Sequence, residues 1–236
     1  QEPIEIVELN DNHRHRHIFT RKLNLKGDII SSRSPLFFNE DVIISKGFAQ
    51  EQMAYLYRNA RYDECIFIQK GKGFIISSFG EMEVKKYDYV VIPKGVIWKM
   101  VLDSDIEFLA IETKNPIETP SKYRNRLGQL LEHSPYSERD ILTPNLKNKN
   151  FNGPINIKVR IDNGLQTYQY KEHPFDVIGW DGYYFPWIFN LRDFMPITGM
   201  IHQPPPVHQV FQANGVVICN FVPRLFYYNT FAGPSP

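Results

Sequence analysis

The sequence predicts an all-β protein, and three observations lead to this fold class. Short apolar runs follow one another from about residue 36 to 112, separated by turn residues such as KGKG at 70–73 and IPKG at 92–95. No long helical pattern interrupts this region. A hairpin pattern, INIKVRIDNGLQTYQYKE, occupies 155–172. Short strands at close and regular spacing are typical of a β-barrel or β-sandwich.

The expected strands of the first half are the apolar runs themselves. In chain order they read LFF, VIIS, AYLY, CIFI, FIIS, MEV, YVVI, IWKMV and FLAIE. In the second half, isoleucine and valine alternate before Asp-Asn-Gly, and Tyr168 and Tyr170 follow it. This is a strong hairpin pattern. VVICNFVPRLFYY at 216–228 predicts another buried strand and its exit.

The composition is that of an ordinary soluble globular protein. The chain has 236 residues, 42% hydrophobic and 22% charged, with a net charge of +1. This charge gives no electrostatic reason to expect nucleic acid or an anionic membrane as a partner. No apolar run approaches the roughly 18 residues that span a bilayer. The start, QEPIEIVELN, lacks the pattern of a signal peptide. Cys65 and Cys219 lie in apolar runs, so we expect buried free thiols and a cytoplasmic protein.

Residues 115–150 break the β pattern and are expected to connect two units. RNRLGQLLEH within this segment predicts a short helix, with Leu127, Leu130 and Leu131 on one side. His133 would then cap the end of that helix or lie on the surface. HRHRH at 13–17 has two interpretations, a metal-binding tract or a solvated basic segment. We favour the solvated segment, because the interleaved arginines would oppose a bound cation.

The stretch from His173 to Gln209 concentrates aromatic residues, prolines and histidines, which favours the wall of a pocket over a linker. Within it, the triproline at 204–206 separates His202 from His208. A polyproline segment rises about 3.1 Å per residue, so the two imidazoles are poor candidates for one metal ion. From spacing alone, His202 is best interpreted as a core histidine. His208 is a candidate for the rim of the pocket. It is also a substrate-binding candidate, ranked below His202.

The first half resembles a cupin barrel in two motifs. In the first motif, Glu64 and Gly71 hold the last two places at the expected spacing, while Tyr57 and Asn59 stand where two histidines are usual. In the second, Pro93 and Gly95 fit, Tyr87 replaces a glycine and Trp98 replaces a histidine. Because imidazoles hold a cupin metal, we expect the first barrel to be a scaffold without metal, with Glu64 as a solvated or hydrogen-bonded structural residue.

The chain from about residue 13 to 228 resembles the homogentisate 1,2-dioxygenase family, through PLFFNEDV, YRNARYDE, DYVVIPKG, EHSPYSERD and HPFDVIGWDGYYFPWIFNLRDFMPITGMIHQPPPVHQ. The resemblance implies a bicupin with an N-terminal barrel at 1–114, a connecting segment at 115–150 and a second barrel, incomplete in this sequence, at 151–236. It also implies extradiol-type ring cleavage of a dihydroxy aromatic by Fe(II) and O2, in tyrosine and phenylalanine catabolism. A homo-oligomer, a trimer or hexamer, is implied as well.

The resemblance implies that His202 acts on a substrate hydroxyl as acid and base. It places the iron ligands after Asn229, where this sequence has no His, Asp or Glu, so no metal ligand is assigned. Two explanations follow, a missing stretch after about Asn229 or a chain that cannot hold iron, and we expect the first. The alternative function is a non-catalytic bicupin binding protein that lacks a metal. A weaker alternative is a cupin isomerase or other metalloenzyme that acts on a related aromatic.

Overall fold

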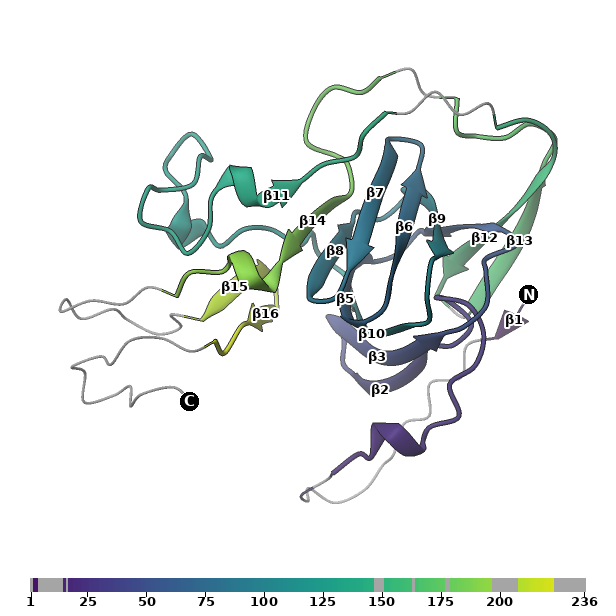
Figure 1. Ribbon diagram of the computed structural model, residues 1–236, viewed down its shortest axis with the longest axis horizontal. Coiled ribbons are helices and arrows are strands. Elements are labelled where there is room, and N and C mark those ends of the chain that lie inside the picture. The colour runs from purple at the N-terminus through teal and green to yellow at the C-terminus, as the bar shows by residue number, and fades with distance from the viewer. Residues whose placement is uncertain are drawn as a thin grey trace.

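The computed structural model describes residues 2–3, 15, 17–146, 151–162, 164–176, 179–196 and 208–222. Two seven-stranded sheets face each other, and a two-stranded sheet lies to one side (Figure 1). The first sheet has the order β1 (Glu2–Pro3), β13 (Gly164–Tyr170), β12 (Ile155–Ile161), β4 (Leu56–Asn59), β9 (Ile97–Leu102), β6 (Lys72–Ser77) and β7 (Gly80–Lys85). The second has the order β11 (Ile141–Leu142), β14 (Trp187–Asn190), β8 (Asp88–Ile92), β5 (Asp63–Lys70), β10 (Ile106–Thr113), β3 (Val42–Ala49) and β2 (Ser34–Phe38).

The remaining elements are few. The two-stranded sheet pairs β15 (Gln209–Ala213) with β16 (Val216–Cys219). The helical turns of the described residues are η1 (Thr20–Lys22), η2 (Ser121–Tyr123), η3 (Glu138–Asp140) and η4 (Leu191–Asp193). The all-β fold class is therefore confirmed. Each apolar run of the first half is a strand, from β2 to β10, because alternate side chains of each run can enter the core.

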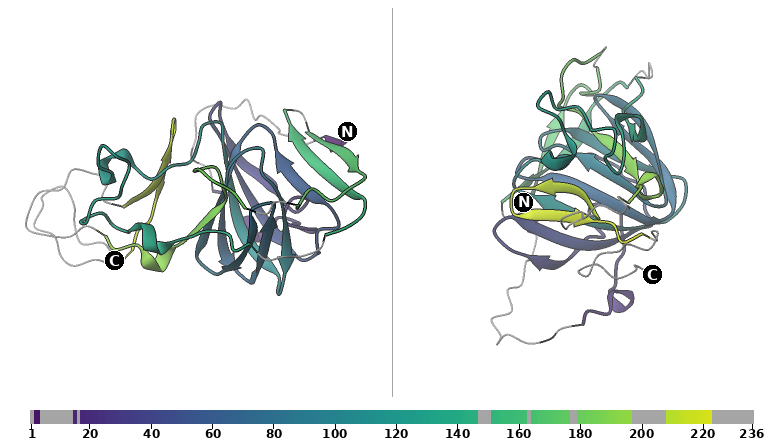
Figure 2. Two further views of the ribbon diagram at one scale, coloured as in Figure 1. Left: turned by 90° about the horizontal axis from the view of Figure 1, so that it is seen from above. Right: turned by 90° about the vertical axis from the view of Figure 1, so that its left-hand side faces the viewer.

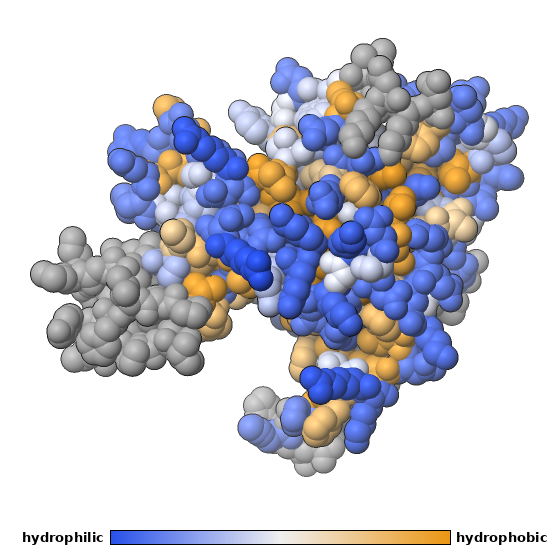
Figure 3. Space-filling model, in the orientation of Figure 1, coloured by the Kyte–Doolittle hydropathy of each residue, from blue (hydrophilic) through white to orange (hydrophobic). Residues whose placement is uncertain are grey.

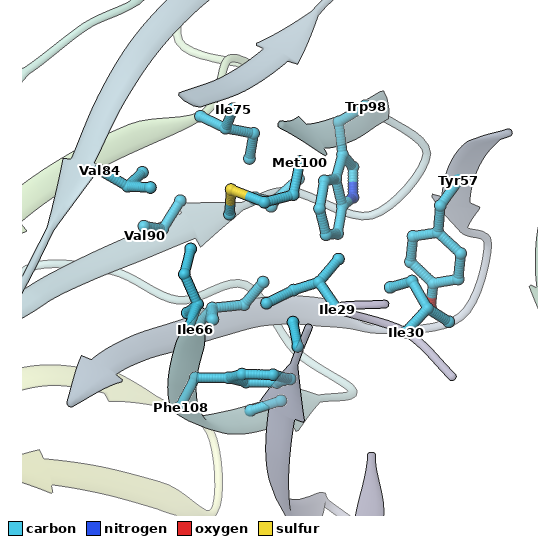
Figure 4. Close-up of a cluster of buried hydrophobic side chains, with 14 of the residues drawn as sticks. Ile29, Ile30, Tyr57, Ile66, Ile75, Val84, Val90, Trp98, Met100 and Phe108 are labelled. Atoms are coloured by element: carbon cyan, nitrogen blue, oxygen red, sulfur yellow. The ribbon is translucent and has the colours of Figure 1, made fainter. Parts of the chain in front are cut away.

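The main core fills the space between the two large sheets. Ile75 and Met100 point inward from β6 and β9, and Ile66 and Phe108 oppose them from β5 and β10 (Figure 4). Trp98 is fully buried and meets Tyr57 edge to face, with ring centroids 5.5 Å apart. Burial of such large apolar side chains is the dominant stabilising contribution to a fold of this kind.

A second cluster covers the outer face of the second sheet. Tyr89 and Phe189 face outward from β8 and β14 and pack against Phe211 of β15. Tyr123 and Tyr136, from the segment that follows β10, complete the cluster and donate hydrogen bonds to backbone carbonyls of β15. The 117–142 segment and the β15–β16 hairpin thus pack against this face of the sheet.

The predicted hairpin at 155–172 is confirmed as β12 and β13, but its place in the fold is not the expected one. β12 pairs in parallel with β4, so that Val159 lies opposite Arg58. Ile157 and Val159 pack with Leu56 on the outer face of the first sheet. The sequence pattern places the hairpin in the 151–236 unit, but the hairpin belongs to a sheet of the first barrel, at the end away from β15–β16 (Figures 1 and 2). Division of the chain into two barrels as a whole stays a prediction.

The helix predicted at 124–133 is wrong. Arg124 and Leu130 form an antiparallel bridge instead. The side chain of Asn125 accepts hydrogen bonds from the backbone of Leu127 and Gln129, and Gly128 adopts a left-handed φ of 85°. An Asx turn followed by a left-handed glycine folds the backbone back on itself and overrides the leucine spacing. Leu127 is exposed as a result, and His133 caps no helix.

Two turn positions explain why the cupin motifs favour glycine there. At Gly71, φ is 95° and a Cβ atom would overlap the carbonyl oxygen of Asp105. Tyr87 occupies a glycine position of the second motif, and its φ of 76° is the one positive φ of a non-glycine residue in the described ranges. Its ring lies near Lys86 and Arg192, with 4.6 and 5.2 Å between each cation and the ring centroid.

Polar side chains cover most of the face seen in the space-filling view, with apolar side chains between them (Figure 3). Within the described ranges, no helix has the length and apolar character needed to cross a bilayer. Both cysteines are free thiols; Cys65 is buried, and Cys219 is only half-buried. Burial raises the pKa of the Cys65 thiol to about 12.

Candidate functional site

Residues that hold the cupin-motif positions converge inside the first barrel. Tyr57 and Trp98 are direct partners across β4 and β9, and Glu64 and Glu112 are partners across β5 and β10. Asn59 donates a hydrogen bond to Oε1 of Glu112 at 2.8 Å, and the Tyr57 hydroxyl lies 3.4 Å from Oε1 of Glu64. The site therefore contains two buried carboxyl groups on adjacent strands.

Two arginines compensate these carboxyl groups. Arg33 Nη1 lies 2.5 Å from Oε1 of Glu64, and Arg160 Nε lies 3.7 Å from Oε1 of Glu112. Like charges directly opposite on a sheet are destabilising, so the arginines make the arrangement of Glu64 and Glu112 possible. The predicted hydrogen-bonded role of Glu64 is confirmed, whereas solvation is excluded because its side chain is 1% exposed.

Burial and charge shift the proton affinities of this network. Burial raises the pKa of Glu112, and the nearby guanidinium of Arg33 partly offsets this effect. Burial acts to lower the pKa of Arg33, but Glu64, Tyr57 and Glu112 together raise it above its ordinary value. Burial and the Glu64 carboxylate also hold the pKa of Tyr57 well above 10. Arg33 therefore stays charged and Tyr57 stays neutral near neutral pH.

Arg33 comes from the turn between residues 28 and 33. Asp28 accepts hydrogen bonds from the backbone of Ile30 and Ser31 and from the Tyr55 hydroxyl. Arg33 Nε donates to the carbonyl oxygen of Ile29 at 3.0 Å. This turn fixes the guanidinium that meets Glu64.

The motif positions do not fit Fe(II). Tyr57 and Asn59 are bound to glutamates, and the Trp98 indole can only donate a hydrogen bond. Glu64 already has a cation as its partner. Among the residues that the structure describes, no three His, Cys, Asp or Glu side chains are grouped to hold a metal ion.

A pocket of about 330 Å³ opens beside this network. Its charged lining consists of Arg33, Arg160, Lys158, Glu2 and Glu112. Its other lining residues are hydroxyl-bearing or apolar: Ile30, Ser31, Pro35, Ile43, Ser45, Tyr55, Tyr57 and Leu165. The volume falls at the small end of the range for ligand pockets.

The sequence did not indicate Arg33, Glu112 or Arg160. One pattern could have shown Glu112: it stands in phase with Ile106, Phe108 and Ala110, the inward face of β10. Arg160 lies on the polar face of an alternating strand, a position that predicts solvent exposure, yet the residue is 3% exposed.

The histidines singled out from the sequence do not enter this site. His202 lies outside the described residues, as does every residue after 222. His208 is buried at the start of β15, where its carbonyl oxygen accepts a hydrogen bond from Asn220 and its ring lies 4.8 Å from Phe221. His15 and His17 are exposed, and the rest of the HRHRH segment lies outside the described ranges.

The aromatic run at 180–189 divides between core and surface. Trp187 and Phe189 pack in the cluster on the second sheet, whereas Tyr183 is fully exposed. Trp180 meets Phe79 edge to face at 5.7 Å between centroids. Part of this run is thus core, and its function as a pocket wall stays a prediction.

Two facing sheets, antiparallel at every strand pair except β4–β12, define the first barrel as a cupin, with Gly71, Pro93 and Gly95 at the turns where the motifs require them. The model of the homogentisate 1,2-dioxygenase N-terminal family matches residues 34–191. A protein of Saccharolobus solfataricus that bears the provisional name of a dioxygenase is 42% identical over 218 residues, which are 92% of this chain and 56% of that protein. The chain belongs to the homogentisate dioxygenase-like family and spans about half the length of this relative.

Solved structures show weaker similarity. A cupin protein of Bacteroides fragilis overlaps 44% of this chain and 86% of its own, at 21% identity and a TM-score of 0.34. A variant of salicylate 1,2-dioxygenase from Pseudoaminobacter salicylatoxidans, in complex with gentisate, overlaps 37% of this chain and 26% of its own, at 10% identity and a TM-score of 0.31. The family assignment rests on the sequence matches.

Proposed function

We propose that this chain forms part of an Fe(II)-dependent dioxygenase that cleaves the ring of homogentisate or a similar dihydroxy aromatic with O2. The observation that carries the proposal is the family match over residues 34–191, which covers most of the first barrel and the segment behind it. The 42% identical relative bears the name of a dioxygenase, which supports the same reaction class.

In this proposal the first barrel is a scaffold, because Tyr57, Asn59 and Trp98 stand at the histidine positions of the motifs and Glu64 is paired with Arg33. No iron ligand is assigned in this sequence; the iron would bind the substrate and O2, and would be held by ligands that the family resemblance places after Asn229. His202 is the proposed acid and base for a substrate hydroxyl, a task that suits an imidazole with a pKa near 6.5. His208 is a proposed substrate contact of lower rank.

Oxygen consumption tests the proposal. Full-length protein loaded with Fe(II) is expected to consume O2 when homogentisate or a related dihydroxy aromatic is added, and to give a ring-opened product. Absence of uptake with every such substrate by iron-loaded protein would contradict it. His202→Ala should lower turnover at least tenfold while iron stays bound, and an unchanged rate would remove His202 from the reaction.

The second candidate function is a bicupin binding protein without catalysis. The Arg33–Glu64 pair favours it, since this barrel has a cation of its own where a cupin usually places a metal. Metal analysis of full-length protein separates the two candidates: stoichiometric iron supports the dioxygenase, and its absence after anaerobic purification with added Fe(II) supports the binding protein.

Three further proposals depend on the proposed dioxygenase function. They are a place in the catabolism of tyrosine or phenylalanine, a cytoplasmic location and a homotrimer or homohexamer. Sedimentation of the full-length protein measures the last of these directly.

A further inference from the structure

The pocket of the first barrel is lined by hydrogen-bond donors that have no acceptor in the described part of the chain. Among the described residues, Nη2 of Arg33 and Nη1 of Arg160 have no hydrogen-bond partner. Both side chains line the pocket and are more than nine-tenths buried, with 8% and 4% of each exposed. A buried polar group without a partner is destabilising, and more so when it is charged, so two such groups at one pocket call for an explanation.

Within the described residues that line the pocket, both unpartnered side-chain atoms are hydrogen-bond donors. Trp98 Nε1, next to Tyr57 but not in the pocket lining, is a further buried donor without a described partner, against the Ser32 hydroxyl and one carboxylate oxygen, Oε2 of Glu64. The missing partner is therefore a hydrogen-bond acceptor. The planar guanidinium of arginine matches the two oxygens of a carboxylate better than any other side chain does.

Net charge does not decide the ligand. The lining contains three cationic side chains, those of Arg33, Lys158 and Arg160, and two acidic ones, Glu2 and Glu112. Glu64 does not line the pocket, but its ion pair with Arg33 adds a third acidic side chain beside the three cationic ones. Recognition would thus rest on directed N–H donors, and the affinity would depend only weakly on salt.

The rest of the lining is suited to an apolar body. Ile30, Ile43, Pro35 and Leu165 contribute to its walls. The Lys158–Glu2 ion pair, with 2.9 Å between Nζ and Oε2 and 59% of the Glu2 side chain exposed, lies on the accessible side. An inorganic anion would satisfy the arginines but leave these apolar side chains without contact.

We propose that the pocket beside Arg33 and Arg160 binds a small organic monocarboxylate with an apolar body, such as a short aliphatic or simple aromatic acid. The proposal rests on residues of the first barrel alone, and the occupancy of the pocket does not depend on the dioxygenase reaction.

Calorimetric titration of the 236-residue chain with benzoate and butyrate tests the proposal, with benzamide and inorganic phosphate as comparison probes. At least one of the two acids is expected to bind at one site per chain, at least tenfold more tightly than benzamide and phosphate. Absence of binding by both acids, equal binding of benzamide, or binding of phosphate alone would each overturn it.

Two variants locate the binding. Ile43→Phe fills the pocket and should weaken binding at least tenfold, whereas Ile44→Phe, on the opposite face of the same strand, should leave it unchanged. Leu165→Phe provides a second filled pocket if Ile43→Phe does not fold. Unchanged affinity in a folded pocket-filling variant would place the acid elsewhere and overturn the proposal.

Discussion

Arg33 donates a hydrogen bond from Nη1 to Oε1 of Glu64 over 2.5 Å, with 8% and 1% of the two side chains exposed. Glu64 holds a carboxylate position of the cupin motif, so a guanidinium has taken the place of a metal as its partner. A buried pair of this kind is costly to break, because the charge that remains has neither water nor a counterion.

Removal of one partner should therefore destabilise the barrel strongly. Arg33→Met or Glu64→Gln alone is expected to lower the free energy of unfolding by about 3–5 kcal/mol. The double variant should recover a large part of that loss, since no unpaired charge stays buried. Urea denaturation of the four proteins measures the coupling energy.

The exposed pair of Arg61 and Asp162, with 2.6 Å between Nε and Oδ1, provides the control. Solvent screens both groups, and the same cycle there should give a coupling of about 1 kcal/mol or less. Equal coupling energies at the two pairs would contradict the importance of burial.

Backbone strain at Tyr87 gives a second prediction. Its φ of 76° costs a side chain with a Cβ atom about 1–2 kcal/mol, and glycine avoids that cost. Tyr87→Gly should therefore be more stable than Tyr87→Ala by about 1 kcal/mol, as judged from chemical denaturation. Because both variants lose the ring and its contacts with Lys86 and Arg192, their difference reports the backbone alone. If alanine proved the more stable of the two, strain at this turn would be refuted.

His173 gives a pH dependence. Burial, with a smaller contribution from Lys99, lowers its pKa below 6.5 in the folded state. The unfolded chain then binds more protons than the folded one between the folded pKa and about 6.5, so this contribution to stability is present above that pH and is lost as pH falls. His173→Phe keeps a ring to stack on Phe151, 4.7 Å away between centroids, but does not titrate.

Denaturation of both proteins from pH 8 to pH 5 measures this effect. Stability of the wild type relative to His173→Phe is expected to stay constant above about pH 7 and to decrease below pH 6.5. An increase in relative stability at low pH would show that the folded state favours the protonated ring.

The place of the β12–β13 hairpin gives a fourth prediction. Val159 is 4% exposed and packs with Leu56 of β4. Val159→Ala should lower the free energy of unfolding of the whole barrel by about 2 kcal/mol, through lost burial and a residual cavity. Hydrogen exchange should quicken in β4 and β9 as well as in β12. Faster exchange confined to β12 and β13 would instead indicate an independent unit, and Thr167→Ala, at an exposed position of β13, serves as the control.

Much of the first barrel could be predicted because its strands alternate apolar and polar residues, and this alternation follows from local geometry. The convergence of Tyr57, Glu64 and Trp98 could also be predicted from motif spacing. The turn at Asn125–Gly128 could not be seen from the leucine pattern, since one Asx turn outweighed the helical spacing of three leucines.

The arginines of the site were missed for a different reason. Arg160 reaches Glu112 only because β12 pairs in parallel with β4, so that Arg160 is the direct partner of Asn59. Local sequence contains no information about which distant strand completes a sheet. Arg33 lies in a turn whose direction depends on the bonds of Asp28, and these too appear only in three dimensions.

The parallel pairing of β4 and β12 also determines the order in which the barrel can be built during synthesis. β4 emerges from the ribosome first, and its partner strand follows only after the whole connecting segment has been made. At synthesis rates of about 5–20 residues per second, the edge of β4 waits on the order of ten seconds for that partner. During this interval the nascent barrel exposes an unpaired edge and Glu112 still lacks Arg160, so chaperone contact is expected at this stage of translation.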